Sequence, residues 1–177
     1  ALSILIKYLK FTYKSSVNNI SYLNFYKNSQ YMAIDLSAKK NLEITENIKT
    51  KDKRKSLLGV LDKTKTPMGK RMIKKFLDQP LINIVNINKR LDAVEELYNN
   101  SIMRMSLTEA FSGIFDIERL LTKIIFQSIN PRELQSFKFT IGNIKNVKEA
   151  LKDSKSSLLQ QLCSDIDLLE DIYTLIN

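Results

Sequence analysis

Closely spaced basic residues are the side chains of this sequence with the clearest capacity for chemistry. Five of them fall within seven positions: Lys49, Lys51, Lys53, Arg54 and Lys55. Cations at this density attract polyanions, and nucleic acid is the common polyanion that proteins meet. Such side chains would contact phosphate groups and would not read bases, because no rigid element is expected to hold them in a groove. The alternative interpretation is a solvated loop in a lysine-rich chain.

The composition excludes most catalytic and metal chemistry. The 177 residues contain no histidine and a single cysteine, Cys163. Ser-His and Cys-His catalytic pairs, metal sites built from these residues and disulfides within the chain are therefore excluded. Two close carboxylate pairs remain, Glu95/Glu96 and Asp165/Asp167, and neither is expected to form an acid–base site. We expect no metal site, and Cys163 is interpreted as a small, inert hydrophobic residue.

A phosphate-binding loop is also excluded. The nearest match is the stretch from Thr64 to Arg71, where Thr64 replaces the first glycine and Arg71 replaces the serine or threonine that binds Mg²⁺. The whole chain has four glycines, too few for a Gly-rich dinucleotide loop. We therefore expect neither a cofactor nor enzyme activity in these 177 residues.

A second group of polar residues, Asp62, Thr64, Thr66 and Arg71, is spaced to turn the chain into a helix. Short Asp and Thr side chains bond nearby backbone N–H groups. Thr66 is the expected cap, and Pro67 suits the first helical position. Arg71 is expected to reach Asp62 or a backbone carbonyl group. The structural interpretation is a stable turn, and the functional interpretation is a relay between domains, which position alone does not demonstrate.

The elements that must position these residues are mainly helices. Glycine and proline together account for 7 of 177 residues, so turns are scarce and long helices are favoured. Caps and apolar spacing then predict the individual helices. They span residues 2–13, 37–44, 56–61, 67–79, 84–98, 102–112, 117–125, 131–151 and 166–176, with Asp116, Asn130 and Asp165 capping the last three.

The remaining segments are short. Residues 20–26 and 31–35 are aromatic and β-branched, which predicts two extended segments that could pair as antiparallel strands. Residues 46–55 are expected to form a charged loop. The predicted fold class is therefore all-α, an irregular multi-helix domain with a minor extended region near the N-terminus. No apolar stretch approaches the ~20 residues of a membrane span, and one unpaired cysteine without an export signal suits the cytoplasm.

The apolar residues of several expected helices are assigned to faces that pack. One stripe follows the spacing of a coiled-coil seam: Ile84, Ile87, Leu91, Val94 and Tyr98. Another lies on the helix that follows Asp116: Ile117, Leu120, Leu121, Ile124 and Ile125. Leu57, Leu58 and Leu61 are expected to bury a single turn, and Met103 and Met105 to fill gaps in the core.

The net charge of +9 is divided unequally along the chain. Residues 1–90 carry +13 and residues 91–177 carry −4. The positive charge peaks between residues 39 and 75, which include 13 basic and 4 acidic residues. Any surface for a polyanion is therefore expected in the first half of the chain.

Several blocks of the sequence follow one another in a recognisable order. They are residues 31–35 (Tyr-Met-Ala-Ile-Asp), 41–44 (Asn-Leu-Glu-Ile), 56–71 (Ser-Leu-Leu-Gly-Val-Leu-Asp-Lys-Thr-Lys-Thr-Pro-Met-Gly-Lys-Arg), 80–81 (Pro-Leu), 90–97 (Arg-Leu-Asp-Ala-Val-Glu-Glu-Leu), 116–120 (Asp-Ile-Glu-Arg-Leu) and 131–134 (Pro-Arg-Glu-Leu). In this combination the chain resembles the MutS family of DNA mismatch repair proteins. The resemblance covers nearly the whole chain and is strongest over residues 31–134.

The resemblance implies a division and a role for the chain. Residues 1–20 would be the final helix of a preceding connector domain, and residues 21–177 the first half of a helical core, or lever, domain. The chain would be part of a longer protein, in which it links mismatched-DNA binding to an ATPase domain. That protein would use ATP and Mg²⁺, bind mismatched double-stranded DNA, form a homodimer and have connector, clamp and ATPase domains as neighbours of this segment.

Two other functions are compatible with the residues alone. One is a free-standing helical domain that binds nucleic acid through the basic residues between positions 39 and 75. The other is a helical scaffold whose partner is another protein. Strongly salt-dependent DNA binding would favour the first, and self-association through an exposed seam along residues 84–98 would favour the second.

Overall fold

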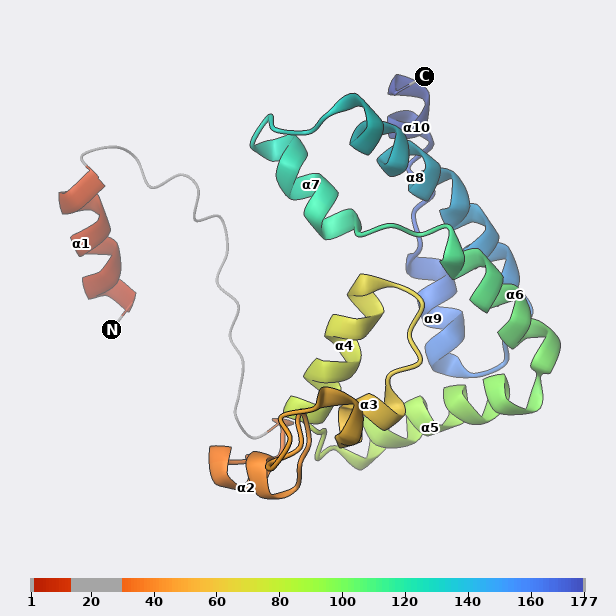
Figure 1. The fold of residues 1–177 in the computed structure, drawn as a ribbon. Coiled ribbons are helices and arrows are strands. Elements are labelled where there is room, and N and C mark those ends of the chain that lie inside the picture. The colour runs from red at the N-terminus through yellow and green to blue at the C-terminus, as the bar shows by residue number, and fades with distance from the viewer. Residues whose placement is uncertain (1, 14–29, 177) are drawn as a thin grey trace.

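The computed structural model describes residues 2–13 and 30–176 and confirms an all-α structure (Figure 1). The predicted helices are present, most of them within a few residues of the expected boundaries. The elements are α1 (Leu2–Tyr13), α2 (Leu36–Asn41), the 3-10 turn η2 (Lys53–Lys55), α3 (Leu57–Leu61), α4 (Pro67–Asp78), α5 (Ile84–Asn99), α6 (Ser101–Ser112), α7 (Ile117–Ile125), α8 (Pro131–Leu151), α9 (Ser157–Asp165) and α10 (Glu170–Leu175).

The N-terminal lobe, which we define as residues 30–82, is held largely by hydrogen bonds from short polar side chains. The residue before each of its helices accepts a bond from a backbone N–H group: Asp35 from Ala38, Asp52 from Arg54, Ser56 from Gly59 and Thr66 from Gly69. The cap predicted at Thr66 is therefore confirmed, with Pro67 in the first helical position. Within this lobe, the one buried hydrophobic residue is Ile44.

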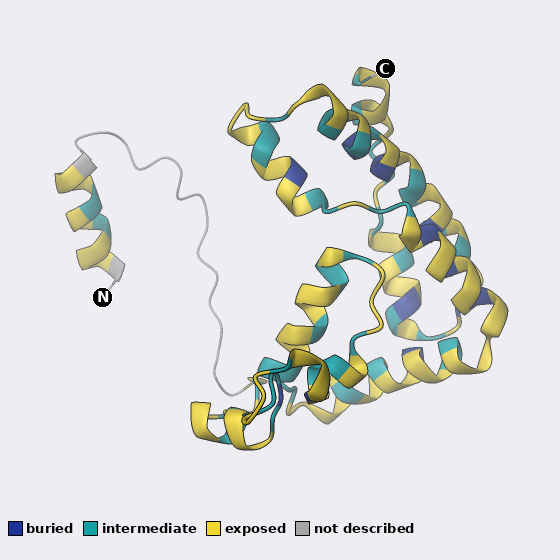
Figure 2. Cartoon of the chain, in the orientation of Figure 1, coloured by how far each residue is buried: buried dark blue, intermediate teal, exposed yellow. Residues whose placement is uncertain are grey.

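The helical body, which we define as residues 84–176, contains most of the apolar core. One cluster joins α5, α6, α8 and α9: Ala93, Met103, Leu107, Ala110, Val147, Leu151 and Leu159. A second cluster, Leu120, Phe137 and Ile141, joins α7 and α8, and α10 packs against it. Figure 2 shows the buried positions gathered mainly along these helices.

Helix α8 takes part in both clusters and ties the body together. Its 21 residues extend over about 32 Å at the usual rise of 1.5 Å per residue. It begins with the capping box that the sequence predicts, in which Asn130 and Glu133 each bond the other's backbone N–H group. A well-fixed start and two contact clusters make α8 the central support of the body.

The predicted extended region is limited to one antiparallel bridge in the part of the chain described. Tyr31 pairs with Leu81, with flanking backbone hydrogen bonds of 2.8 and 3.3 Å. Residues 20–26, expected to be extended, lie outside the described residues. The partner of Tyr31 therefore comes from far along the chain, where Pro80 ends the run of α4. The charged loop predicted at residues 46–55 is confirmed, and its end winds into η2.

The prediction that Asp165 caps the last helix is wrong. Asp165 is the last residue of α9, and α10 begins only at Glu170. Leu169 interrupts the helical run because it adopts left-handed backbone angles, φ 50° and ψ 43°. The carboxylate of Asp167 accepts a hydrogen bond from its N–H group at 3.0 Å. The sequence alone does not distinguish an aspartate that ends one helix from an aspartate that caps the start of the next one, which explains the error.

Several apolar residues assigned to packed faces are exposed instead. They are Leu57, Leu61, Met105, Leu121 and Ile125, together with Ile84, Leu91, Val94 and Tyr98 on α5. The physical reason is that each helix concerned has neighbours on one side only, whereas its apolar residues cover a wider arc. The neighbours Leu120 and Met103 are buried as expected. Periodicity thus identified apolar faces correctly and overestimated how much of each is covered.

Candidate functional site at the Arg71 junction

Arg71 forms the most extensive polar contact between the N-terminal lobe and the helical body. It lies on the second turn of α4, and its guanidinium donates to both carboxylate oxygens of Asp116, with Nη1 to Oδ2 at 2.7 Å and Nη2 to Oδ1 at 2.8 Å. Nη2 also donates to Oε2 of Glu118 at 2.5 Å. Paired bonds from one guanidinium to one carboxylate fix orientation as well as distance. The start of α7 is therefore tied to α4.

Local sequence places both partners of this junction. Thr66 and Pro67 fix the start of α4, and so they fix the direction in which Arg71 projects. Asp116 is the cap of α7, where it also accepts from the N–H of Arg119 at 3.3 Å. Glu118 lies in the first turn of the same helix. Carboxylates at a helix start are stabilised by the helix dipole, so α7 presents two negative charges at one point.

Charge at the junction is stable across neutral pH. Hydrogen bonds from Arg71 hold the pKa of Asp116 below its ordinary value, although burial opposes this shift. Bonds to Asp116 and then Glu118 raise the pKa of the Arg71 guanidinium. Arg71 and Asp116 therefore both remain ionised at neutral pH, and this pair does not exchange protons there. It can hold two segments together, with a strength that falls as salt screens the exposed side.

The four residues predicted as a relay are divided between a turn and this junction. Thr64 donates to Oδ1 of Asp62 through its hydroxyl at 2.6 Å and its backbone N–H at 3.2 Å, and the first of these bonds is the main cause of a lowered pKa for Asp62. Thr66 caps α4. The expectation that Arg71 reaches Asp62 is wrong. The cation that pairs with Asp62 is Lys70, at 3.8 Å, and Arg71, about 100° further round the helix, faces α7.

A cation–π contact gives the lobe and the body a second side-chain connection. The guanidinium carbon of Arg90, on α5, lies 3.9 Å from the centre of the Phe76 ring on α4. Such stacking is attractive because the ring face carries negative charge. Together with the Arg71 junction it fixes α4 at two points, five positions apart, in the middle and near the end of the helix.

The basic loop, residues 46–55, forms an ordered turn. The side-chain oxygen of Asn47 accepts from the N–H groups of Lys49 and Thr50 at 3.1 and 3.0 Å. Glu43 in turn accepts from the side chain of Asn47 at 2.9 Å. The five predicted cations, Lys49, Lys51, Lys53, Arg54 and Lys55, are all exposed. The structure brings them together on one turn, where they could contact a polyanion.

Two of these cations already have acidic neighbours. Lys51 Nζ lies 3.4 Å from Glu46, and Arg54 Nε lies 3.4 Å from Asp52. The pKa of Asp52 is lowered, first by the backbone N–H of Arg54 and then by its side chain. Among the described residues, Lys49, Lys53 and Lys55 form no ion pair, so they are the three more available charges.

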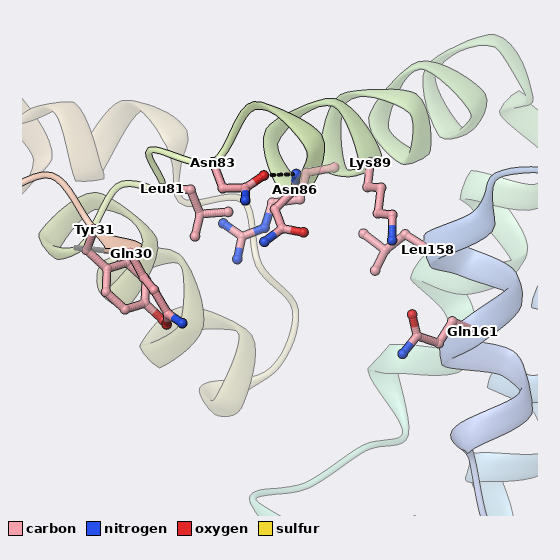
Figure 3. A pocket seen from close by; sticks show the side chains of 9 residues that line it. Gln30, Tyr31, Leu81, Asn83, Asn86, Lys89, Leu158 and Gln161 are labelled. Carbon is pink, nitrogen blue, oxygen red and sulfur yellow. Dashed lines mark hydrogen bonds between the residues drawn. The ribbon is translucent and has the colours of Figure 1, made fainter. Parts of the chain in front are cut away.

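A groove of about 410 Å³ lies between the lobe and α9 (Figure 3). Its lining combines carboxamides, two cations and a tyrosine, and contains no carboxylate: Gln30, Tyr31, Leu81, Asn83, Asn86, Lys89, Arg90, Leu158 and Gln161. Arg90 is engaged by the Phe76 ring, and Asn83 caps α5 by accepting from Asn86 at 3.2 Å. The groove offers hydrogen bonds and positive charge, and it holds no pair of groups suited to acid–base or nucleophilic catalysis.

Two residues that organise the body were not identified from the sequence. Glu96 accepts from the backbone N–H groups of Lys155 and Ser156 at 2.6 and 2.7 Å, and so holds the turn that precedes α9 from a different helix. Thr140 is fully buried on α8 and accepts from the N–H of Phe115 at 3.1 Å. Neither contact has a local sequence signal, because each joins residues 25 or more positions apart. The sequence offered one signal of these contacts, namely a polar residue among the apolar residues of a helix that packs in the core.

Two other kinds of feature, a metal site and a membrane-spanning helix, are absent from the described residues. Over residues 2–13 and 30–176, no group of three or more Cys, Asp or Glu side chains could hold a metal ion. In the same part of the chain, no helix combines the length and apolar character needed to cross a membrane.

Comparison with known proteins identifies the family. A sequence model described as MutS domain III matches residues 37–177. The DNA mismatch repair protein MutS of Caldicellulosiruptor saccharolyticus is 49% identical over 179 residues, covering all of this chain and 21% of that protein. The proteins of the same name from Caldanaerobacter subterraneus and Clostridioides difficile are 44% and 41% identical over the whole chain.

The chain spans about a fifth of the length of these relatives. The matched residues include α2 without its first residue and all of α3 to α10, and therefore both sides of the Arg71 junction. The sequence blocks 56–71 and 116–120, which carry the resemblance, are the two stretches that Arg71 connects to Asp116 and Glu118. On this evidence, the chain belongs to the MutS family of DNA mismatch repair proteins and is a segment of such a protein that matches its domain III.

Proposed function

We propose that this segment is a mechanical core that couples mismatched-DNA binding to ATP hydrolysis in a longer protein. The observation that carries the proposal is the Arg71 junction, because it joins the N-terminal lobe to the helical body by a directional, permanently charged contact. A displacement of α7 would pull on α4 through this contact. The two regions would otherwise communicate mainly through the Phe76–Arg90 stack and the chain itself.

The body has the properties that such a role requires. Helix α8 contacts both core clusters, so it would carry a displacement along its length with little bending. The ends of the body are then mechanically linked, whereas the lobe is attached through specific side chains. A stiff helix in one region, with a second region attached through a few specific side-chain contacts, is a common basis of domain rearrangement.

The proposal includes the surroundings of the segment in the full-length protein. Residues 1–20 would end a connector domain, and residues 21–177 would begin the core. The full-length protein would bind ATP and Mg²⁺ and mismatched double-stranded DNA through parts outside this chain, act as a homodimer and work in the cytoplasm. The segment itself would contribute no catalytic residue.

The test uses the full-length protein with Arg71→Ala. We expect the increase in ATPase rate caused by mismatched DNA to fall several-fold, while the rate without DNA and the affinity for a mismatch stay near their original values. Lys70→Ala is the matched control, because Lys70 is the adjacent cation and makes only a 3.8 Å contact with Asp62. An unchanged response to mismatched DNA in Arg71→Ala would contradict the proposed coupling role.

A second candidate function is supported by the basic loop. Its five cations are exposed on an ordered turn, and Lys49, Lys53 and Lys55 lack ionic partners in the described part of the chain. The loop would bind the phosphate backbone of nucleic acid without reading its sequence. Binding of this kind would add to the affinity of the full-length protein for DNA.

A further inference from the structure

The bridge between Tyr31 and Leu81 leaves backbone groups without partners. The two hydrogen bonds that hold it, of 2.8 and 3.3 Å, come from the residues on either side of the pair. In an antiparallel pair of this kind, the N–H and C=O groups of the two paired residues point outward, away from each other. Within residues 30–176, the backbone groups of Tyr31 and Leu81 form no hydrogen bond. Unpaired edges of this kind are templates for a further strand.

This open edge borders the groove between the N-terminal lobe and α9. Tyr31 and Leu81 both line the groove. Figure 3 shows its other walls, with Lys89 on α5 and Gln161 on α9. A strand added to the bridge on the side of the groove would therefore be flanked by side chains of both helices.

The uncharged side chains of the groove suit a peptide. The carboxamides of Gln30, Asn86 and Gln161 form no hydrogen bond within the described residues. A carboxamide both donates and accepts, so it matches the amide groups of an extended chain. Leu81 and Leu158 add apolar contact area between these polar groups.

Charge determines the chemistry of the segment that would bind. Lys89 and Arg90 line the groove together with no carboxylate, and neither forms an ion pair in the described part of the chain. These two cations would favour a segment with Asp or Glu side chains. Residues 14–29, which precede the groove in the sequence, contain two lysines and no carboxylate, so they do not supply the complementary charge.

We infer that this groove binds an extended acidic segment of a partner protein, which adds to the Tyr31–Leu81 bridge as a further strand. In this mode of recognition, main-chain hydrogen bonds supply affinity and the neighbouring side chains supply specificity. A peptide fits the open edge better than nucleic acid does, because nucleic acid has no row of backbone N–H and C=O groups to pair with it. The inference is independent of the coupling role proposed for Arg71.

The experiment measures binding of a fluorescent octapeptide to the full-length protein by anisotropy. The peptide has glutamate and valine in alternation, so that its carboxylates share one face of a strand. One control peptide has glutamine in place of glutamate, and the other has N-methyl groups on alternate amides, which removes the N–H groups that strand pairing needs. We expect the first peptide to bind at least tenfold more tightly than either control.

A charge reversal in the protein locates the site. Lys89→Glu should weaken binding of the acidic peptide at least fivefold. Lys65→Glu is the matched control, because Lys65 is exposed, lies outside the groove and forms no ion pair in the described residues, and it should change the affinity less than twofold.

Several results would overturn the inference. They are no binding of the acidic peptide, equal binding of either control peptide, and equal losses in Lys89→Glu and Lys65→Glu. Binding of duplex DNA that weakens as much as peptide binding does in Lys89→Glu would also overturn it, because the groove would then be a surface for phosphate groups.

Discussion

The N-terminal lobe and the helical body are held together by different forces. In the lobe, four caps hold the starts of short helices, and among residues 30–82 the one buried hydrophobic residue is Ile44. The body buries ten such residues in two clusters joined by α8. Directional hydrogen bonds are individually weak and exchange readily with water, whereas a packed core opens cooperatively. The lobe is therefore expected to open at lower cost than the body.

The two regions also differ in charge, and the Arg71 junction lies where they meet. Residues 1–90 carry +13 and residues 91–177 carry −4. Arg71 comes from the basic half, and both Asp116 and Glu118 come from the acidic half. The Arg71 junction therefore links the positively charged half of the chain to the negatively charged half through one well-oriented ionic contact. Such a contact can hold the two regions together without a large buried interface.

The largest effect is expected from the core of the body. Phe137 is 3% exposed, so Phe137→Ala should lower the free energy of unfolding by about 3–5 kcal/mol. Phe139→Ala is the control on the same helix, because Phe139 is 57% exposed, and it should cost less than about 1 kcal/mol. Urea midpoints measure both. Similar losses for the two variants would mean that α8 is oriented differently.

A smaller effect, dependent on pH, is expected at Glu96. Burial tends to raise its pKa, but hydrogen bonds from the N–H groups of Lys155 and Ser156 prevail and lower it. A group with a lowered folded-state pKa stabilises the protein fully above its unfolded pKa of about 4.3, and this contribution is lost as pH falls through the folded value. Glu96→Ala removes two hydrogen bonds to a carboxylate and should therefore cost about 1–2 kcal/mol at pH 7.

The pH profile provides the check on this interpretation. Between pH 6 and pH 3.5 the unaltered chain should lose more stability than Glu96→Ala, so the two urea midpoints should approach one another. Parallel profiles would show that Glu96 does not act through its charge.

A local effect is expected in the lobe. Thr66→Ala removes the cap of α4 and should cost about 1 kcal/mol, and Thr66→Ser, which keeps the hydroxyl, should cost little. Hydrogen exchange should accelerate at the first amides of α4, including Gly69, while amides of α8 exchange as before. If α8 were affected equally, the lobe and the body would unfold as one unit and the comparison between them would fail.

The smallest effect on stability, and a clear one on binding, is expected from the basic loop. Binding of the chain to duplex DNA should be weak, indifferent to mismatches and reduced by salt. Five phosphate contacts would give a log–log salt slope of about −4 to −5. Because Lys51 and Arg54 have carboxylate neighbours, we expect about −3. Serine at all five positions should abolish binding and leave the helical signal intact. Preference for a mismatch would contradict this account.

Helix boundaries could be predicted because their causes are local. Thr66, Asn83, Asp116 and Asn130 all cap helices as expected, since a cap bonds an N–H group only three residues away. The same rule failed at Asp165, where the neighbouring Leu169 adopts a left-handed conformation that leucine rarely takes. The resemblance to the family was also local in origin, because it depended on short blocks in order.

The candidate site could be predicted only in part, because its partners are distant in sequence. Asp62, Thr64 and Thr66 interact within a few residues, and their turn was expected. Arg71 bonds Asp116, 45 positions away, and no pattern within α4 indicates that partner. Periodicity marked the seam of α5 as an apolar face, but which side of a helix is covered depends on tertiary packing.

The central claim is that the contact between Arg71 and Asp116 couples the lobe to the body, and a double-mutant cycle tests it most directly. Arg71→Ala, Asp116→Asn and the double variant are compared in the full-length protein by the ATPase increase that mismatched DNA causes. Asparagine still caps a helix, so Asp116→Asn removes the charge and keeps the start of α7. The account predicts that Asp116→Asn adds no further loss once Arg71 is alanine, whereas alone it loses part of the effect, because Arg71 also bonds Glu118. Losses that multiply independently would contradict it.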